Sequence, residues 1–115
     1  LKFLMDGCVK FAYPHGHDQL LLITLENKTK NKTLLRTVPD VAQDGTFLQF
    51  PPHQIFSDPS GFSVSTKDDY EITMVYHRPL HAAQVQHGMG NYLMYMTPGA
   101  CSTEATASLS AAPAN

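Results

Sequence analysis

Two histidines separated by a single residue, His15-Gly16-His17, are the first candidates for chemistry in this sequence. In an extended strand, residues two apart project from the same face, so both imidazoles can be aimed at one ion. Two nitrogens make half a metal site, and a soft thioether as third ligand favours Cu(I) over zinc. Met89 is the candidate for that ligand, because Gly88 and Gly90 leave its side chain room to reach a partner. The alternative interpretation is a pair of surface histidines beside Pro14.

Short strands must position these residues, because no apolar stripe with a helical repeat occurs before about residue 98. The pattern predicts an all-β fold, an antiparallel β-sandwich that is jelly-roll-like, in a single domain over residues 1–101. Alternation along one segment places Ile72 and Met74 on one face, which we expect to be core, and Met94 and Met96 are also expected there. The expected strands are Val9–Tyr13, Gln19–Leu25, Thr33–Val38, Thr46–Phe50, Phe62–Ser65, Tyr70–Tyr76 and Asn91–Thr97.

The composition changes after Cys101 to Ala, Ser, Thr and Pro. Such a segment carries too little large apolar surface to offset the entropy of ordering it. Residues 102–115 are therefore expected to form a flexible tail or linker.

Charge and hydropathy exclude several classes of function. The net charge is −2 and only 16% of the residues are charged, so the sequence predicts no nucleic-acid partner. The longest apolar run, at residues 20–25, is far shorter than the roughly 20 residues that a bilayer span needs. The sequence also contains no glycine-rich phosphate loop, nucleophile elbow or HExxH motif.

Cysteines and sequons point to an oxidising compartment. Cys8 and Cys101 lie near opposite ends of the domain, and a bridge between them would stabilise the fold by about 4 kcal/mol in the chain-entropy model. The alternative is two buried free thiols. Asn27 and Asn31 each begin an Asn-Lys-Thr sequon, so both are predicted glycosylation sites of a secreted or secretory-lumen protein. Because the chain begins with Leu1, we expect a processed product or an excised piece.

Two segments in this order, Phe11–His17 and Met89–Tyr95, resemble a known family. They are similar to the C-terminal, catalytic-copper domain of the copper type II, ascorbate-dependent monooxygenases, the family of peptidylglycine α-hydroxylating monooxygenase and dopamine β-hydroxylase. The resemblance implies copper as the cofactor, with His15, His17 and Met89 as its ligands. It also implies a disulfide between Cys8 and Cys101.

The resemblance further implies O2- and ascorbate-dependent hydroxylation of a C–H bond in a small-molecule or peptide substrate. Asn91 and Tyr92 match positions near the family's substrate site. The family's reaction needs a second, electron-supplying copper domain, so the implied partner is such a domain or a parent polypeptide. His77, His81 and His87 are either solvated or able to tune the site through hydrogen bonds.

Two alternatives remain open at this point. A single copper ion without its electron donor would suit a stand-alone copper carrier. A metal-free secreted β-sandwich for adhesion or assembly, with the Ala/Ser/Pro segment as a stalk, would need no ligand set at all.

Overall fold

Most of the described residues lie in strands and very few in helical turns, which confirms the all-β prediction. The computed structural model describes residues 1–17, 19–77 and 90–102. In chain order the elements are β1 (Gly7–Gly16), β2 (Leu20–Asn27), β3 (Lys32–Thr37), β4 (Asp40–Val41), β5 (Phe47–Gln49), the short 3-10 turn η1 (Pro52–Gln54), β6 (Phe56–Val64), β7 (Tyr70–Tyr76) and β8 (Gly90–Pro98). Each strand expected from the sequence is present: β7 has the expected bounds, β6 begins six residues earlier than expected, and the other ends differ by one to three residues. The short strand β4 was not expected.

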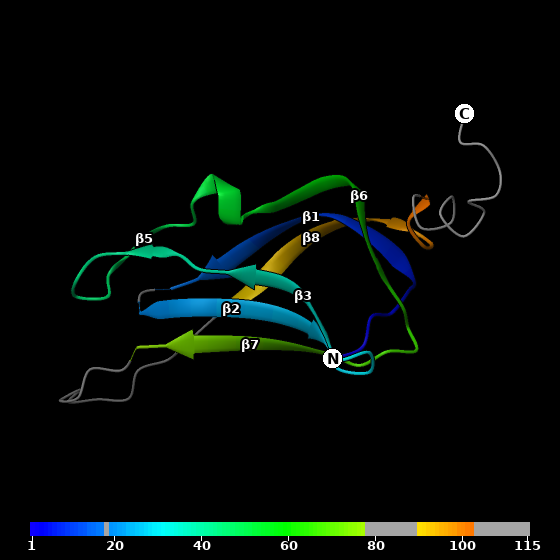
Figure 1. Ribbon diagram of the computed structural model, residues 1–115, viewed down its shortest axis with the longest axis horizontal. Coiled ribbons are helices and arrows are strands. Elements are labelled where there is room, and N and C mark those ends of the chain that lie inside the picture. The colour runs from blue at the N-terminus through cyan, green and yellow to red at the C-terminus, as the bar shows by residue number, and fades with distance from the viewer. Residues whose placement is uncertain (18, 78–89, 103–115) are drawn as a thin grey trace.

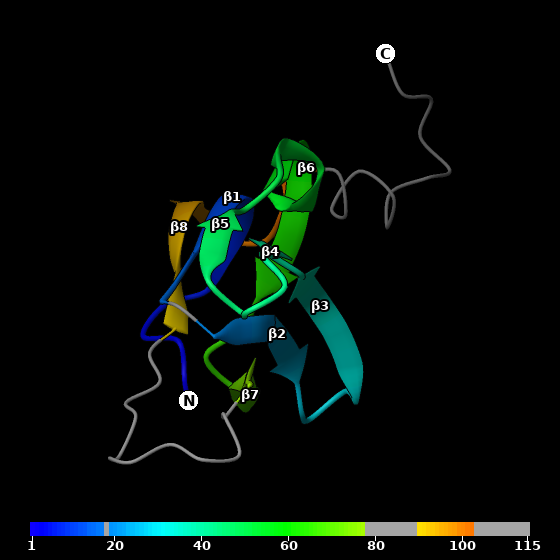
Figure 2. The ribbon, with the colours of Figure 1, turned by 90° about the vertical axis from the view of Figure 1, so that its left-hand side faces the viewer.

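The strands form two antiparallel sheets that pack together (Figure 1). One sheet has the order β6-β1-β8 and the other the order β3-β2-β7, while β4 and β5 form a separate small ladder. Figure 2 shows the two sheets as two layers, with β1 and β2 as their respective central strands. The jelly-roll-like connectivity stays a prediction. No helix in the described ranges is long and apolar enough to cross a bilayer.

The core lies between the layers, and each sheet contributes three buried side chains to it. Met94 and Met96 of β8 pack against this cluster, as predicted. Met74 does not: it is 39% exposed, because β7 is an edge strand with β2 as its only described neighbour. The expectation that Met74 is a core residue is therefore wrong, whereas Ile72 does pack against the cluster. The buried cluster consists of Val9, Ala12 and Val64 from one sheet and Leu25, Leu35 and Tyr70 from the other.

Strand β6 begins earlier than expected and includes Asp58, Pro59 and Gly61, residue types that are typical of turns. Between the pairs Phe11↔Ser57 and Val9↔Phe62, residues 58–61 of β6 lie opposite Lys10 alone. The surplus residues form a bulge, which is where Asp, Pro and Gly can be accommodated in a strand. Gly61 has a φ of 68°, and an added Cβ there would meet the Val9 carbonyl oxygen at 2.5 Å.

A disulfide joins Cys8 to Cys101, as predicted, with the two Cα atoms 4.7 Å apart. Cys8 lies near the start of β1 and Cys101 follows β8, so the bridge ties together the ends of two paired strands. Both cysteines are buried. The bridge lies at the end of β1 that is remote from His15, about 20 Å away along an extended strand. It therefore fixes the fold without taking part in the candidate site.

Candidate metal centre

The two histidines of the His-Gly-His segment lie at the end of β1. Along this strand Tyr13 and His15 are exposed while Ala12 and Pro14 are buried, which is the two-residue alternation of a sheet with one solvent face. Pro14 is tolerated because it lies beyond the last described β1–β6 pair, where β1 has only β8 beside it. The exposed face thus presents His15, and His17 follows one residue after the strand ends.

The two imidazole rings lie close enough to share one ion. Their centroids are 5.2 Å apart, the planes are inclined by 78°, and both side chains are exposed. Two imidazoles that bind one metal at about 2.0–2.1 Å from nitrogen have ring centroids about 5–6 Å apart. The pair therefore fits two corners of a metal site. Among the described residues, no group of three or more His, Cys, Asp or Glu side chains could hold a metal ion. A third ligand would therefore be a residue of another type or a residue outside the described ranges.

The predicted third ligand, Met89, lies outside the described residues. Its chain neighbour Gly90 is the first residue of β8 and pairs with Gly16, the residue between the two histidines. The end of β1 and the start of β8 therefore lie side by side.

Asn91 and Tyr92, the predicted substrate residues, project to opposite faces of their sheet. Asn91 is exposed and pairs directly with His15, so its side chain shares the face of that histidine. Tyr92 faces the interior: its hydroxyl lies 3.0 Å from the Ile23 carbonyl oxygen and 2.9 Å from Thr37 Oγ1. Burial raises the pKa of Tyr92, partly offset by the Thr37 hydrogen bond. Asn91 therefore shares the exposed face of His15 and Tyr92 does not, and the substrate role of both residues stays a prediction.

Gln19 is a residue of this region that the sequence did not single out. Its backbone has a φ of 76°, a left-handed value that is uncommon for a residue other than glycine. Its N–H donates to Gly45 O at 3.0 Å, and its carbonyl accepts from His77 N–H at 2.7 Å. Gln19 thus joins the start of β2 to the β4–β5 loop and to the end of β7. No sequence pattern signals this role, because Gln has no preference for left-handed backbone.

The remaining histidines are not part of the pair. His77 is exposed at the end of β7, and its described contact is the backbone hydrogen bond to Gln19. His53 is exposed on η1. His81 and His87 lie outside the described residues. The tuning role proposed for His77, His81 and His87 stays a prediction.

Asn27 is the last residue of β2, and Asn31 lies in the turn between β2 and β3. Figure 1 shows this turn at the opposite end of the sheets from the end of β1, where the histidines lie. Asn27 is buried, with 4% of its surface exposed, and Asn31 is exposed. The sequence alone could not separate them, since both tripeptides read Asn-Lys-Thr.

Comparison with known proteins adds no relative. No family model matches the chain, and no significant match is found among curated proteins or solved structures. Its function must therefore be inferred from the residues and their geometry.

Proposed function

We propose that this chain is a copper-binding domain in which His15, His17 and Met89 hold one copper ion. One observation carries the proposal: two exposed imidazoles lie 5.2 Å apart at a strand end that faces Gly90, the residue bonded to Met89. Two nitrogens and one thioether make a donor set that favours Cu(I). The same set is the one implied by the resemblance to the catalytic half of copper monooxygenases.

Within that proposal, the copper ion and the residues around it have separate roles. Bound copper would supply the one-electron and O2 chemistry needed to hydroxylate an activated C–H bond. The strand pair β1–β8 holds the imidazoles on a solvent-exposed face, and Asn91 lies beside His15 where its amide can orient a substrate. The electron-supplying second copper would come from another domain or from the parent polypeptide. Without such a partner, the same ligands would serve a copper carrier.

The disulfide supports a location in the secretory pathway or outside the cell. A buried bridge that closes a sequence separation of 93 residues persists in an oxidising compartment and is rare where thiols are kept reduced. Copper chemistry that uses dioxygen and ascorbate is compatible with that location. The location is part of the proposal, together with glycosylation of the sequon region.

The test is a Cu(I) titration of the full chain under anaerobic conditions, in competition with a chromophoric chelator. We expect one Cu(I) per chain, with affinity lowered at least about tenfold in His17→Ala and in Met89→Ala, because each variant removes one of three ligands. His53→Ala is the matched control, since it removes an exposed imidazole that is not part of the pair. Equal affinities for wild type and His17→Ala would overturn the proposal.

A second measurement separates an enzyme from a carrier. Ascorbate-dependent oxygen consumption is measured for the copper-loaded chain, alone and mixed with a candidate second copper domain. Consumption that requires His15 and increases in the mixture supports the monooxygenase. Tight Cu(I) binding without oxygen consumption in either arrangement supports the carrier.

Assembly through β8 is a second candidate function, favoured by the composition of this strand. β8 is an edge of its sheet, contains no charged residue, and exposes Leu93 (72%) and Tyr95 (62%). The other edge strands of the two three-stranded sheets carry features that discourage pairing with another strand: Lys32 and Arg36 in β3, Glu71 in β7, and the bulge in β6. An exposed, uncharged edge is a template for another strand.

The occupant that suits this edge is a second copy of the chain. Antiparallel pairing of two β8 strands centred on Met94 would set Leu93 against Tyr95 of the second copy, and no like charges would oppose each other. Sedimentation velocity is expected to show a dimer that Leu93→Lys converts to a monomer. Leu48→Lys, at a position 60% exposed on β5, is the control and should leave the dimer intact. A wild-type monomer at every concentration would exclude this candidate.

A further inference from the structure

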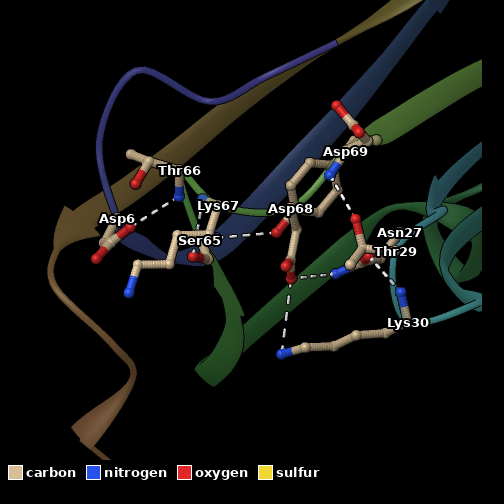
Figure 3. A network of polar contacts seen from close by, with 10 residues as sticks. Asp6, Asn27, Thr29, Lys30, Ser65, Thr66, Lys67, Asp68 and Asp69 are labelled. Carbon is tan, nitrogen blue, oxygen red and sulfur yellow. Dashed lines mark hydrogen bonds and ion pairs between the residues drawn. The ribbon is translucent and has the colours of Figure 1, made fainter.

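Asn27 and Asn31 begin equivalent sequons, yet their side chains have different environments in the fold. Asn27 is the last residue of β2, the central strand of its sheet, and pairs with Lys32 on one side and Tyr70 on the other. Its Nδ2, the atom that would carry a glycan, donates to Asp68 Oδ2 at 2.8 Å. Its Oδ1 accepts from the Lys30 N–H at 3.0 Å. Both polar atoms of the side chain are therefore used inside the fold (Figure 3).

The rest of the first sequon is bound to the loop that precedes β7. The Thr29 hydroxyl accepts a hydrogen bond from Asp69 N–H at 2.8 Å, and Lys28 N–H donates to Asp69 O at 2.8 Å. The hydroxyl of the third residue is a required part of the sequon. In the folded protein, both the asparagine amide and the hydroxyl of this tripeptide are thus occupied by Asp68 and Asp69.

The second sequon is open to solvent. Asn31 is exposed in the turn and has a φ of 53°, a left-handed conformation that asparagine adopts more readily than most residues. Lys32 and Thr33, at the start of the edge strand β3, are exposed as well. No side-chain hydrogen bond of Asn31 or Thr33 is found within the described part of the chain.

We infer that Asn31 is the N-glycosylation site of this protein and that Asn27 is a structural residue that stays unmodified in the folded molecule. A glycosyl transferase would move a sugar from a lipid pyrophosphate-linked oligosaccharide to Asn31. The bond between sugar C1 and phosphate breaks, a bond from C1 to Asn31 Nδ2 forms, the lipid pyrophosphate leaves, and the amide nitrogen loses one proton. The inference rests on the proposed location in the secretory pathway.

A sugar on Asn27 would conflict with the packing around it. The residue is 4% exposed, so the glycan could leave the fold only if the end of β2 separated from its neighbours. The carboxylate of Asp68, which is 7% exposed, would then keep Lys30 Nζ, at 3.6 Å, as its one side-chain partner among the described residues. Loss of a partner by a buried carboxylate is costly. Chains modified at Asn27 are therefore expected to fail to reach the folded state.

The experiment is secretion of the full chain from a eukaryotic cell behind a cleavable leader. The secreted, folded protein is treated with a peptide glycanase in ¹⁸O water, which marks each formerly glycosylated Asn, and is then mapped by mass spectrometry. We expect the mark on Asn31 alone. A mark on Asn27 of the folded protein, or none on Asn31, would overturn the inference.

Matched variants separate the sequon from the fold. Thr33→Ala is expected to abolish the glycan on Asn31, whereas Thr33→Ser keeps the hydroxyl and should retain that glycan. Thr33 is exposed, so thermal unfolding of the two variants should coincide after deglycosylation. Because glycan mapping needs no copper, this inference and the copper proposal can fail separately.

Discussion

The hydroxyl of Tyr92 donates a hydrogen bond to the main-chain carbonyl of Ile23 at 3.0 Å, which links β8 of one sheet to β2 of the other. The Thr37 hydroxyl, 2.9 Å from the same oxygen, then serves as donor to Tyr92, since a phenol has a single hydrogen to give. This bridge crosses the layers one residue away from Asn91. It therefore helps to hold the start of β8 beside the histidines of β1.

Replacing Tyr92 with Phe is expected to lower the free energy of unfolding by about 1–3 kcal/mol, because the Ile23 carbonyl and the Thr37 hydroxyl lose their partner. Urea denaturation at neutral pH measures the change. Tyr95→Phe is the control, since Tyr95 is 62% exposed and its hydroxyl can be solvated. Equal losses in the two variants would show that the bridge does not stabilise the fold.

The same tyrosine predicts how stability depends on alkaline pH. Burial raises the pKa of Tyr92 in the folded protein above its ordinary value of 10.0. As the pH rises, the unfolded chain therefore releases this proton at a lower pH than the folded protein does. The stabilisation that protonated Tyr92 contributes is complete below pH 10 and is lost as the pH rises through the folded-state pKa. Unfolding free energies measured from neutral to alkaline pH should fall less steeply for Tyr92→Phe than for wild type. Parallel curves would contradict this assignment.

Removing the disulfide with the double variant Cys8→Ala, Cys101→Ala is expected to cost about 4 kcal/mol of stability, because the unfolded chain regains the freedom of a loop with a sequence separation of 93 residues. Urea midpoints with and without reductant measure this. Reductant should shift the wild-type midpoint toward that of the variant and leave the variant unchanged. A wild type that is insensitive to complete reduction would refute the prediction.

Gln19→Gly is expected to stabilise the protein by about 1 kcal/mol, since glycine adopts the observed φ of 76° without the steric cost that a Cβ imposes. Gln19→Ala is the matched variant: it also removes the amide but keeps the Cβ. The difference between the melting temperatures of the two variants isolates the backbone effect. A less stable Gly variant would mean that the Gln19 side chain matters more than its conformation.

Asn27→Asp is expected to destabilise the fold strongly at neutral pH, because it places a second carboxylate within 2.8 Å of Asp68 Oδ2. Asn31→Asp, in the exposed turn, is the control and should change stability by less than about 0.5 kcal/mol. Unfolding free energies at neutral pH measure both variants, and equal losses would contradict the prediction.

Local pattern was enough to predict the strands and the core role of Met94 and Met96, because period-two alternation carries that information. The disulfide was suggested by the positions of the two cysteines, which left two free thiols as an alternative, and it was implied by the family resemblance. Met74 was misassigned because alternation indicates a face but not how near the strand is to the edge of its sheet. The sequence does not distinguish the bulge in β6 from a turn, because Asp, Pro and Gly occur in both.

The candidate site was predictable only in part. The spacing of His15 and His17 predicts a shared face, and the structure places the rings accordingly. The pairing of Gly16 with Gly90 depends on strand register, which is set by contacts between residues more than 70 positions apart. Likewise, the different environments of Asn27 and Asn31 follow from the loop that contains Asp68, and no local pattern reports its approach.

The bridge between Cys8 and Cys101 also determines what happens when the backbone is cut. A protease that cleaves the exposed turn between β2 and β3 produces two fragments, and each retains one of the two cysteines. The fragments stay covalently joined and keep their sheet partners, so the nicked protein migrates as one species until a reductant is added. Cleavage of this surface turn would therefore leave the two fragments joined in an oxidising environment, and they would separate only in a reducing one.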